Sequence, residues 1–172
     1  MVVLCLDVIS DIATIVISFL ALIVSIISII YSVKYSKMQM EHNVNSVRPI
    51  SSIVLNDYED KIAVIINNDG TGPLIIKKFI AKNMKEEKSS LIELMPHINQ
   101  PWTTFIETID CRTISVGKKL VLIEMTPLSF NAKQSVRDAL SKITIYLEYE
   151  DIYGNKFKDE RKLEFFGRHN IK

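Results

Sequence analysis

Few residues in this chain have types and spacings that could carry out chemistry. No Gly-x-Ser-x-Gly or His-Glu-x-x-His motif occurs, and the Val116–Lys119 turn lacks the upstream Gly and the following Ser or Thr of a phosphate-binding loop. His42, His97 and His169 fall on a predicted stalk, a loop and the tail, so they are not expected to share a metal ion. We therefore expect a protein that is not an enzyme and needs no cofactor or metal.

Charged side chains could bind ions at two kinds of place. The acidic turns at residues 57–60 and 150–151 could hold calcium if they met at one end of a domain, but turns of this composition are usually solvated, and we favour that interpretation. An anion-binding surface would need lysines to gather, whereas strand alternation places Lys77 and Lys78 on opposite faces. We expect ordinary solvated lysines at Lys77, Lys78, Lys82, Lys118, Lys119, Lys156 and Lys158.

Residues 84–118 form the least regular part of the chain and contain its only tryptophan. Long irregular loops in compact domains are often functional, and tryptophan is enriched at binding hot spots, so Trp102 and His97 form a candidate partner site. Alternatively, Leu91–Met95 and Thr103–Ile109 are edge strands, and Trp102 packs beneath them. We favour this structural interpretation of the tryptophan.

A membrane segment is the strongest feature among the elements that would position these residues. The chain has 172 residues, 48% of them hydrophobic, and Ile12–Val33 runs for 22 residues without a charge. As a helix this segment would reach roughly 33 Å and cross a hydrocarbon core. A cleaved signal peptide would need basic residues before a shorter apolar stretch, yet Lys34 is the first lysine or arginine. We predict an uncleaved transmembrane helix.

The charges that flank the span predict its orientation. Lys34, Lys37 and Arg48 follow the span, whereas Asp7 and Asp11 precede it. Basic residues near a span are retained in the cytoplasm, so we predict the amino end outside and everything after residue 34 in the cytoplasm. The two cysteines lie in different neighbourhoods and give no disulfide framework, which suits a reducing compartment.

The small and polar residues of the predicted span follow a heptad. They are separated by steps of three and four residues, with Ile, Leu, Val and Phe at nearly all other positions: Asp7, Asp11, Thr14, Ser18, Ala21, Ser25, Ser28 and Ser32. Such a stripe lets membrane helices approach closely, so we predict a helix–helix interface and a homo-oligomer. The alternative is a lone anchor whose hydroxyls bond to their own i−4 carbonyls. Whether a bundle would conduct ions stays open.

The pattern changes after the span. Residues 35–46 are polar without a helix breaker and predict a helical stalk that ends at Arg48-Pro49, which gives a membrane part, 1–47, and a second domain, 48–172. A short helix at Asn131–Lys142, with Asn131 as its cap, is expected within that domain. Alternating apolar residues predict strands at Ile50–Leu55, Lys61–Asn67, Leu74–Lys82, Lys119–Thr126, Ile143–Glu150 and Lys156–Phe166. This number of strands favours a two-sheet antiparallel sandwich.

Three turns carry a resemblance to a known class of domain. The segments Asn67–Pro73 (NNDGTGP), Ser115–Lys118 (SVGK) and Tyr149–Asn155 (YEDIYGN) resemble, in this order, marks of bacterial immunoglobulin-like domains. The resemblance covers residues 48–168 and implies an Ig-like β-sandwich in an adhesion, spacer or interaction module of a bacterial inner-membrane protein. The chain lacks the cysteine pair and partnered core tryptophan of antibody domains, which excludes that branch.

Three functions are compatible with these patterns. The leading hypothesis is a non-catalytic, single-pass membrane protein that oligomerises through its helix and binds an unidentified protein partner with a cytoplasmic domain. A second is a ligand-gated membrane effector, of the antiphage-defence type, whose β domain senses a small anionic signal. A third is an exported, anchored adhesion-like module. Nucleic acid is not expected as a partner because the net charge is only +1.

Overall fold

The computed structural model describes the backbone of residues 2–127 and 129–169, and the side chains of 11–127 and 129–168. The chain divides into two compact units, Met1–Asn45 and Ser46–Lys172. The first unit consists of one helix, and the second, called the β domain below, contains all the described strands.

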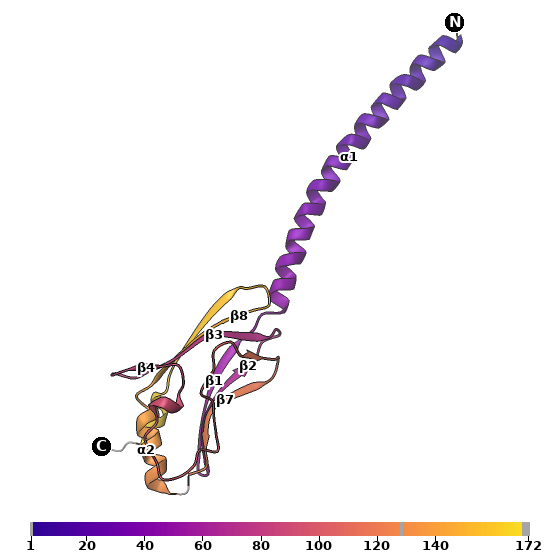
Figure 1. Cartoon of the computed structure of the whole chain (residues 1–172). Helices are drawn as coiled ribbons and strands as arrows, with labels where there is room; N and C mark the ends of the chain where they lie inside the picture. The colour runs from indigo at the N-terminus through magenta and orange to yellow at the C-terminus, as the bar shows by residue number, and fades with distance from the viewer. Residues whose placement is uncertain (1, 128, 170–172) are drawn as a thin grey trace. The chain divides into compact units, whose positions relative to one another are not determined.

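The first unit is the long helix α1 (Val2–Ser46), drawn from indigo to purple in Figure 1. Within it, Asp11–Ser46 is long and apolar enough to cross a membrane, and an 18-residue stretch of it has a mean hydropathy of 2.8. The large apolar side chains from Ile12 to Val33 are exposed in the single chain, so this surface needs lipid or another helix. Signal sequences near an amino terminus share this length and composition. The helix continues to Ser46, as the polar stalk predicted.

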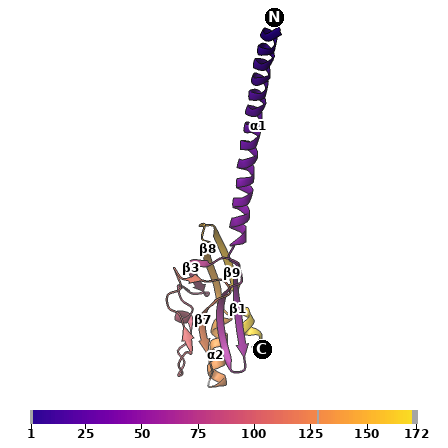
Figure 2. The same ribbon diagram turned by 90° about the vertical axis from the view of Figure 1, so that its right-hand side faces the viewer.

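The β domain consists of two antiparallel sheets, seen from two sides in Figures 1 and 2. Sheet A has the order β1-β2-β7-β5, with strands β1 (Ser51–Tyr58), β2 (Lys61–Asn68), β7 (Lys119–Met125) and β5 (Thr104–Phe105). Sheet B has the order β4-β3-β8-β9, with β6 also paired to β3: β4 (Glu87–Lys88), β3 (Leu74–Lys82), β8 (Thr144–Glu150), β9 (Lys156–Lys162) and β6 (Thr113–Ile114). The prediction of a helix followed by antiparallel sheets is confirmed.

The inner faces of the two sheets share one hydrophobic core. In β8 the side chains of Ile145, Leu147 and Tyr149 are buried and alternate with half-buried residues, as the period of two predicts. Sheet A contributes alternate residues of β2, and Phe79 of β3 is among the largest fully buried side chains. Burial of these apolar faces holds the two sheets together.

The short elements differ from the sequence-based expectations. The helix α2 (Phe130–Leu140) begins one residue earlier than predicted, because the hydroxyl of Ser129 accepts a hydrogen bond from the Ala132 N–H, so Ser129 and not Asn131 is the cap. Strand β9 ends at Lys162 and is followed by the 3₁₀ helix η2 (Glu164–His169), which buries Phe166.

The irregular segment contains less sheet than the edge-strand alternative required. Leu91–Met95 forms the 3₁₀ helix η1 (Ile92–Leu94), and in Thr103–Ile109 only Thr104 and Phe105 form a strand, which pairs with β7. The N–H groups of Thr103 and Ile106 on either side of it also donate to β7 carbonyl oxygens, and Ile109 is buried in the core. The short pairing explains why alternation was a poor guide here.

A polar hub at Asn68 holds the beginning of the β domain. Asn68 is fully buried; its Nδ2 donates to the carbonyl oxygens of Gly72 (2.7 Å) and Ile114 (2.9 Å), and its Oδ1 accepts from the Gly70 N–H (3.1 Å). A Cβ on Gly72 would come within 1.8 Å of the Val47 carbonyl oxygen. Only glycine therefore allows this loop to approach the segment that precedes β1.

Replacing Asn68 by Ala should lower the free energy of unfolding by about 2–4 kcal/mol, because two carbonyl groups and one N–H would lose their buried partner. Asp69→Ala, which changes the adjacent exposed side chain, is the matched control and should have little effect. Urea unfolding of the full chain in lipid nanodiscs, followed by the fluorescence of Trp102, measures both. Equal midpoints for the two variants would contradict the role of the hub.

Candidate functional sites

The predicted helix–helix interface lies along α1. Its members from Asp11 to Ser32 are exposed in the single chain, and the side chain of Asp7 lies outside the described residues. The hydroxyls of Ser18, Ser25 and Ser28 donate to the carbonyl oxygens four residues before them, each at 2.8 Å. Each hydroxyl has thereby used its single proton, and only its lone pairs remain for a neighbouring helix. Any association must then depend on close packing more than on hydroxyl donors.

The two residues of the candidate partner site in the irregular segment differ in burial. Trp102 is half-buried and packs against the hydrophobic core, whereas His97 is exposed. The tryptophan thus has a structural role in the β domain, and the histidine is accessible from solvent.

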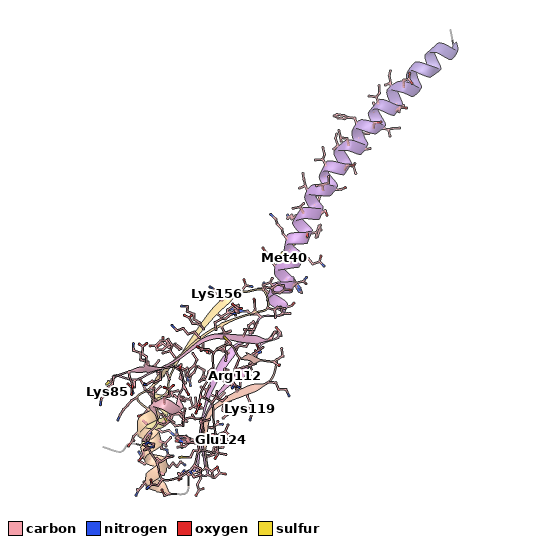
Figure 3. All side chains as sticks on the ribbon, viewed as in Figure 1. Met40, Lys85, Arg112, Lys119, Glu124 and Lys156 are labelled. Atoms are coloured by element: carbon pink, nitrogen blue, oxygen red, sulfur yellow. The ribbon has the colours of Figure 1, made fainter. Side chains whose placement is uncertain are left out.

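Three of the seven candidate lysines form ion pairs with glutamates. The pairs are Lys77 with Glu150 (2.7 Å), Lys158 with Glu148 (2.6 Å) and Lys82 with Glu87. The hydrogen bond that the Lys77 ammonium donates to Glu150 raises the pKa of Lys77, and the hydrogen bond that Lys158 donates to Glu148 lowers the pKa of the Glu148 carboxyl. Figure 3 shows Lys156 and Lys119 on different sheets. The lysines therefore do not form one anion-binding surface.

A β-bulge changes the faces expected for two lysines. The pairing of β3 with β8 shifts register between Ile76 and Lys78, and both Lys77 and Lys78 are exposed. On its other side, Ile76 exchanges backbone hydrogen bonds with Cys111 and Arg112. The expectation of opposite faces was wrong because the extra residue interrupts the alternation.

The two acidic turns lie at opposite ends of the β domain. Asp57 is at the end of β1, whereas the backbone N–H of Ser51, at the start of β1, bonds the hydroxyl of Tyr149 beside the second turn. Burial alone would raise the pKa of the Asp151 carboxyl, but hydrogen bonds from the Asn155 side chain (2.8 Å) and from the N–H groups of Asn155 (2.9 Å) and Tyr153 (2.8 Å) outweigh it and lower that pKa. The turns cannot share a calcium ion. Within residues 11–127 and 129–168, no group of three or more His, Cys, Asp or Glu could hold a metal ion.

The sequence analysis missed a cluster of charges around Asp57. The Asp57 side chain is wholly buried, with Arg137 of α2 donating from Nε and Nη2 (3.1 and 2.8 Å) and Arg168 of η2 lying 2.9 Å from Oδ2. The Lys133 ammonium of α2 lies 3.7 Å from Oδ1 and donates to the carbonyl oxygens of Tyr58 and Glu59. We call Asp57, Lys133, Arg137 and Arg168 the Asp57 cluster.

The cluster joins three distant parts of the chain. Lys133 and Arg137 are four residues apart, so one turn of α2 points both toward the β1–β2 turn. Their side chains are only 10% exposed, whereas that of Arg168 is 33% exposed. The sequence contained one sign of this cluster: Lys133 and Arg137 share a helix face with the apolar Val136 and Leu140. Basic residues on the buried face of a helix need an anionic partner, so this pattern could have predicted a buried ion pair.

A cavity of about 400 Å³ opens beside the cluster. It is lined by Glu59, Pro127, Ser129, Phe130, Lys133 and Arg137. The beginning of α2, the two buried cations and Glu59 therefore face the same space, so the lining has charges of both signs.

Comparison with protein-family models finds no match for this chain, and comparison with curated proteins finds none either.

Asp57→Asn should lower the free energy of unfolding by about 3 kcal/mol or more, because it keeps the shape of the side chain but leaves buried Lys133 and Arg137 without their counter-charge. Glu59→Gln removes one negative charge from an exposed neighbour and is the control. Thermal or urea unfolding of the full chain checks both variants. If Asp57→Asn were as stable as the control, the carboxylate would not hold α2 in place.

Proposed function

We propose that this chain is a non-catalytic, single-pass membrane protein whose α1 helix associates with other copies and whose cytoplasmic, Ig-like β domain binds a partner protein. The observation that carries the proposal is the exposed apolar surface of α1 between Ile12 and Val33. A surface of this length in water would be strongly unfavourable, and a bilayer removes that cost.

The flanking residues support a fixed orientation. Lys34 and Lys37 follow the apolar run immediately, and Arg48 begins the β domain. Asp7 and Asp11, on the amino side of the span, do not keep that end in the cytoplasm, because acidic residues contribute little to orientation. In this orientation the exposed Cys111 thiol meets the reducing cytoplasm, where it remains free.

The stripe of small residues supports association of α1. Hydroxyls that are bonded within their own helix still present little bulk, and Ala21 lies in the same register, so two backbones can approach closely along this face. Each such contact contributes little on its own. Several must act together, which favours an oligomer held along the whole stripe.

The β domain supports a binding role. Two antiparallel sheets with one shared core provide a rigid scaffold whose loops and edges remain available, which is how Ig-like domains are used as interaction modules. The paired lysines and glutamates on β3, β8 and β9 give that surface little net charge. Such a surface fits a protein partner better than a nucleic acid.

Replacing Ser18, Ser25 and Ser32 together by Leu should reduce association of α1 by roughly tenfold or more, because three bulky side chains on the stripe would keep the helix backbones from approaching closely. The control replaces Val16, Ile23 and Ile30 by Leu, which keeps bulky apolar groups off the stripe. Photobleaching steps counted in detergent-free membrane particles give the stoichiometry. The same oligomer for both triple variants, or single molecules for the wild type, would refute the interface.

Fusion of alkaline phosphatase after Lys172 should give an inactive reporter, since that enzyme requires export, and fusion of a fluorescent protein at the same point should give a fluorescent one. The pair of reporters measures orientation in intact cells. Active phosphatase with a dark fluorescent fusion is the reverse pattern, and it would indicate an exported, anchored module instead.

A further inference from the structure

Strand β1 differs from the other strands that end the two described sheets. β4 and β5 have two residues each, and every residue of β9 except Phe157 is charged, so these edges resist pairing with another chain. β1 has eight residues, and Ser51–Asn56 within it contains no charge, glycine or proline. Within the described part of the chain, β2 is the only strand that pairs with β1. The other side of β1 is therefore a sheet edge without the usual protection.

The backbone groups on the free side of β1 belong to its odd-numbered residues. The Ile50 carbonyl oxygen accepts a hydrogen bond from the Asp69 N–H (2.9 Å), and the register continues through β1, so the even-numbered residues exchange hydrogen bonds with β2. The N–H and C=O groups of Ile53 and Leu55 consequently point away from β2. No residue of the described ranges 2–127 and 129–169 bonds them. The backbone groups at the centre of β1 are thus available to another strand.

Side chains of the same domain cap both ends of this free stretch. The Ser51 N–H donates a hydrogen bond to the Tyr149 hydroxyl (3.4 Å), and Arg168 Nη2 donates one to the Asp57 carbonyl oxygen (3.3 Å). Both capped groups belong to odd-numbered residues, as the bonding pattern requires. The two caps lie equally far along the strand from Val54, so Val54 is the centre of the free stretch.

A second copy of β1 is complementary to this stretch when the two strands run antiparallel with a two-fold axis at Val54. Ile53 then lies opposite Leu55 of the second copy, and the two such pairs form backbone hydrogen bonds in both directions. On the other face, Val54 meets Val54, and Ser52 meets Asn56. Apolar side chains thus lie opposite apolar ones, polar side chains lie opposite polar ones, and no like charges meet.

The caps also select this register over its neighbours. Centring the pair on Ile53 would require the Ser51 N–H, and centring it on Leu55 would require the Asp57 carbonyl oxygen, but both of these groups already have partners. The pairing about Val54 uses only free groups in its two central pairs. It therefore forms without breaking a hydrogen bond of the single chain.

We propose that the β1 edges of two copies pair antiparallel about Val54 and join the two copies of sheet A into one continuous sheet. The occupant is a second copy, because the stretch is uncharged and its residues meet matching residues of the same stretch. This contact belongs to the β domain and goes beyond the proposed association of α1. Where α1 helices associate, they raise the local concentration of β1 edges and favour the pairing.

Disulfide formation between full-length chains in isolated membranes tests the contact, after Cys5 and Cys111 have been replaced by Ser. Val54→Cys should cross-link with itself under mild oxidation, because residues of a non-hydrogen-bonded antiparallel pair have Cα atoms about 4.5 Å apart. Asn56→Cys is the matched control, because Asn56 is also half-buried but its two copies would lie about 14 Å apart. We expect at least about tenfold more cross-linked dimer from Val54→Cys than from Asn56→Cys.

Mixed membranes test the register. Ser52→Cys and Asn56→Cys chains expressed together should cross-link with each other, although neither cross-links with itself, because these positions face each other across the axis at Val54. Equal cross-linking of Val54→Cys and Asn56→Cys would overturn the proposal, since random collisions would then explain both. Oligomers counted by photobleaching that form no Val54→Cys disulfide would overturn this contact and leave the association of α1 standing. Single molecules without a disulfide would refute both.

Discussion

The buried carboxylate of Asp57 determines how the second half of the β domain is arranged. An ionised carboxylate without access to water is stable only where cations and N–H donors surround it, and those groups come from α2 and η2. α2 cannot move from the β1–β2 turn without leaving three charges uncompensated. The same charges hold η2, and with it Phe166, over the end of the core. One electrostatic requirement thus fixes elements that the hydrophobic core alone would position less strictly.

Elements governed by neighbours along the chain could be predicted from the sequence. The alternation of apolar residues in β8 predicted that Ile145 and Leu147 lie on the buried face, and both are buried. Gly154 has the positive φ, 81°, that its hairpin requires. Residues 35–46 are polar without a helix breaker, and α1 continues through them to Ser46. The helix ends just before Arg48, whose position before Pro49 disfavours a helical conformation. In each case the deciding contacts lie within a few residues, so the local pattern contains the information.

Features governed by distant contacts could not be predicted. The bulge beside Lys77 lies where Ile76 pairs with Tyr149 of β8 and also exchanges backbone hydrogen bonds with Cys111 and Arg112, more than thirty residues away in the chain. The acidic turn at Asp57 has the composition of a solvated loop, and only the arrival of α2 and η2 buries it. The two cationic residues on the buried face of α2 were a usable signal, because that face also carries Val136 and Leu140 and a basic residue there requires an anion.

The β domain satisfies its buried polar groups in two different ways. At Asn68 the buried amide is matched by Gly70 and Gly72 of its own loop and by the carbonyl oxygen of Ile114. At Asp151 the carboxylate is matched by the N–H groups of Tyr153 and Asn155 in its own turn. At Asp57 the buried carboxylate is matched instead by side chains of α2 and η2, which lie far along the chain. Matching within a turn fixes the shape of that turn, whereas matching between distant elements fixes how those elements pack, because a buried charge that loses its partners is strongly unfavourable.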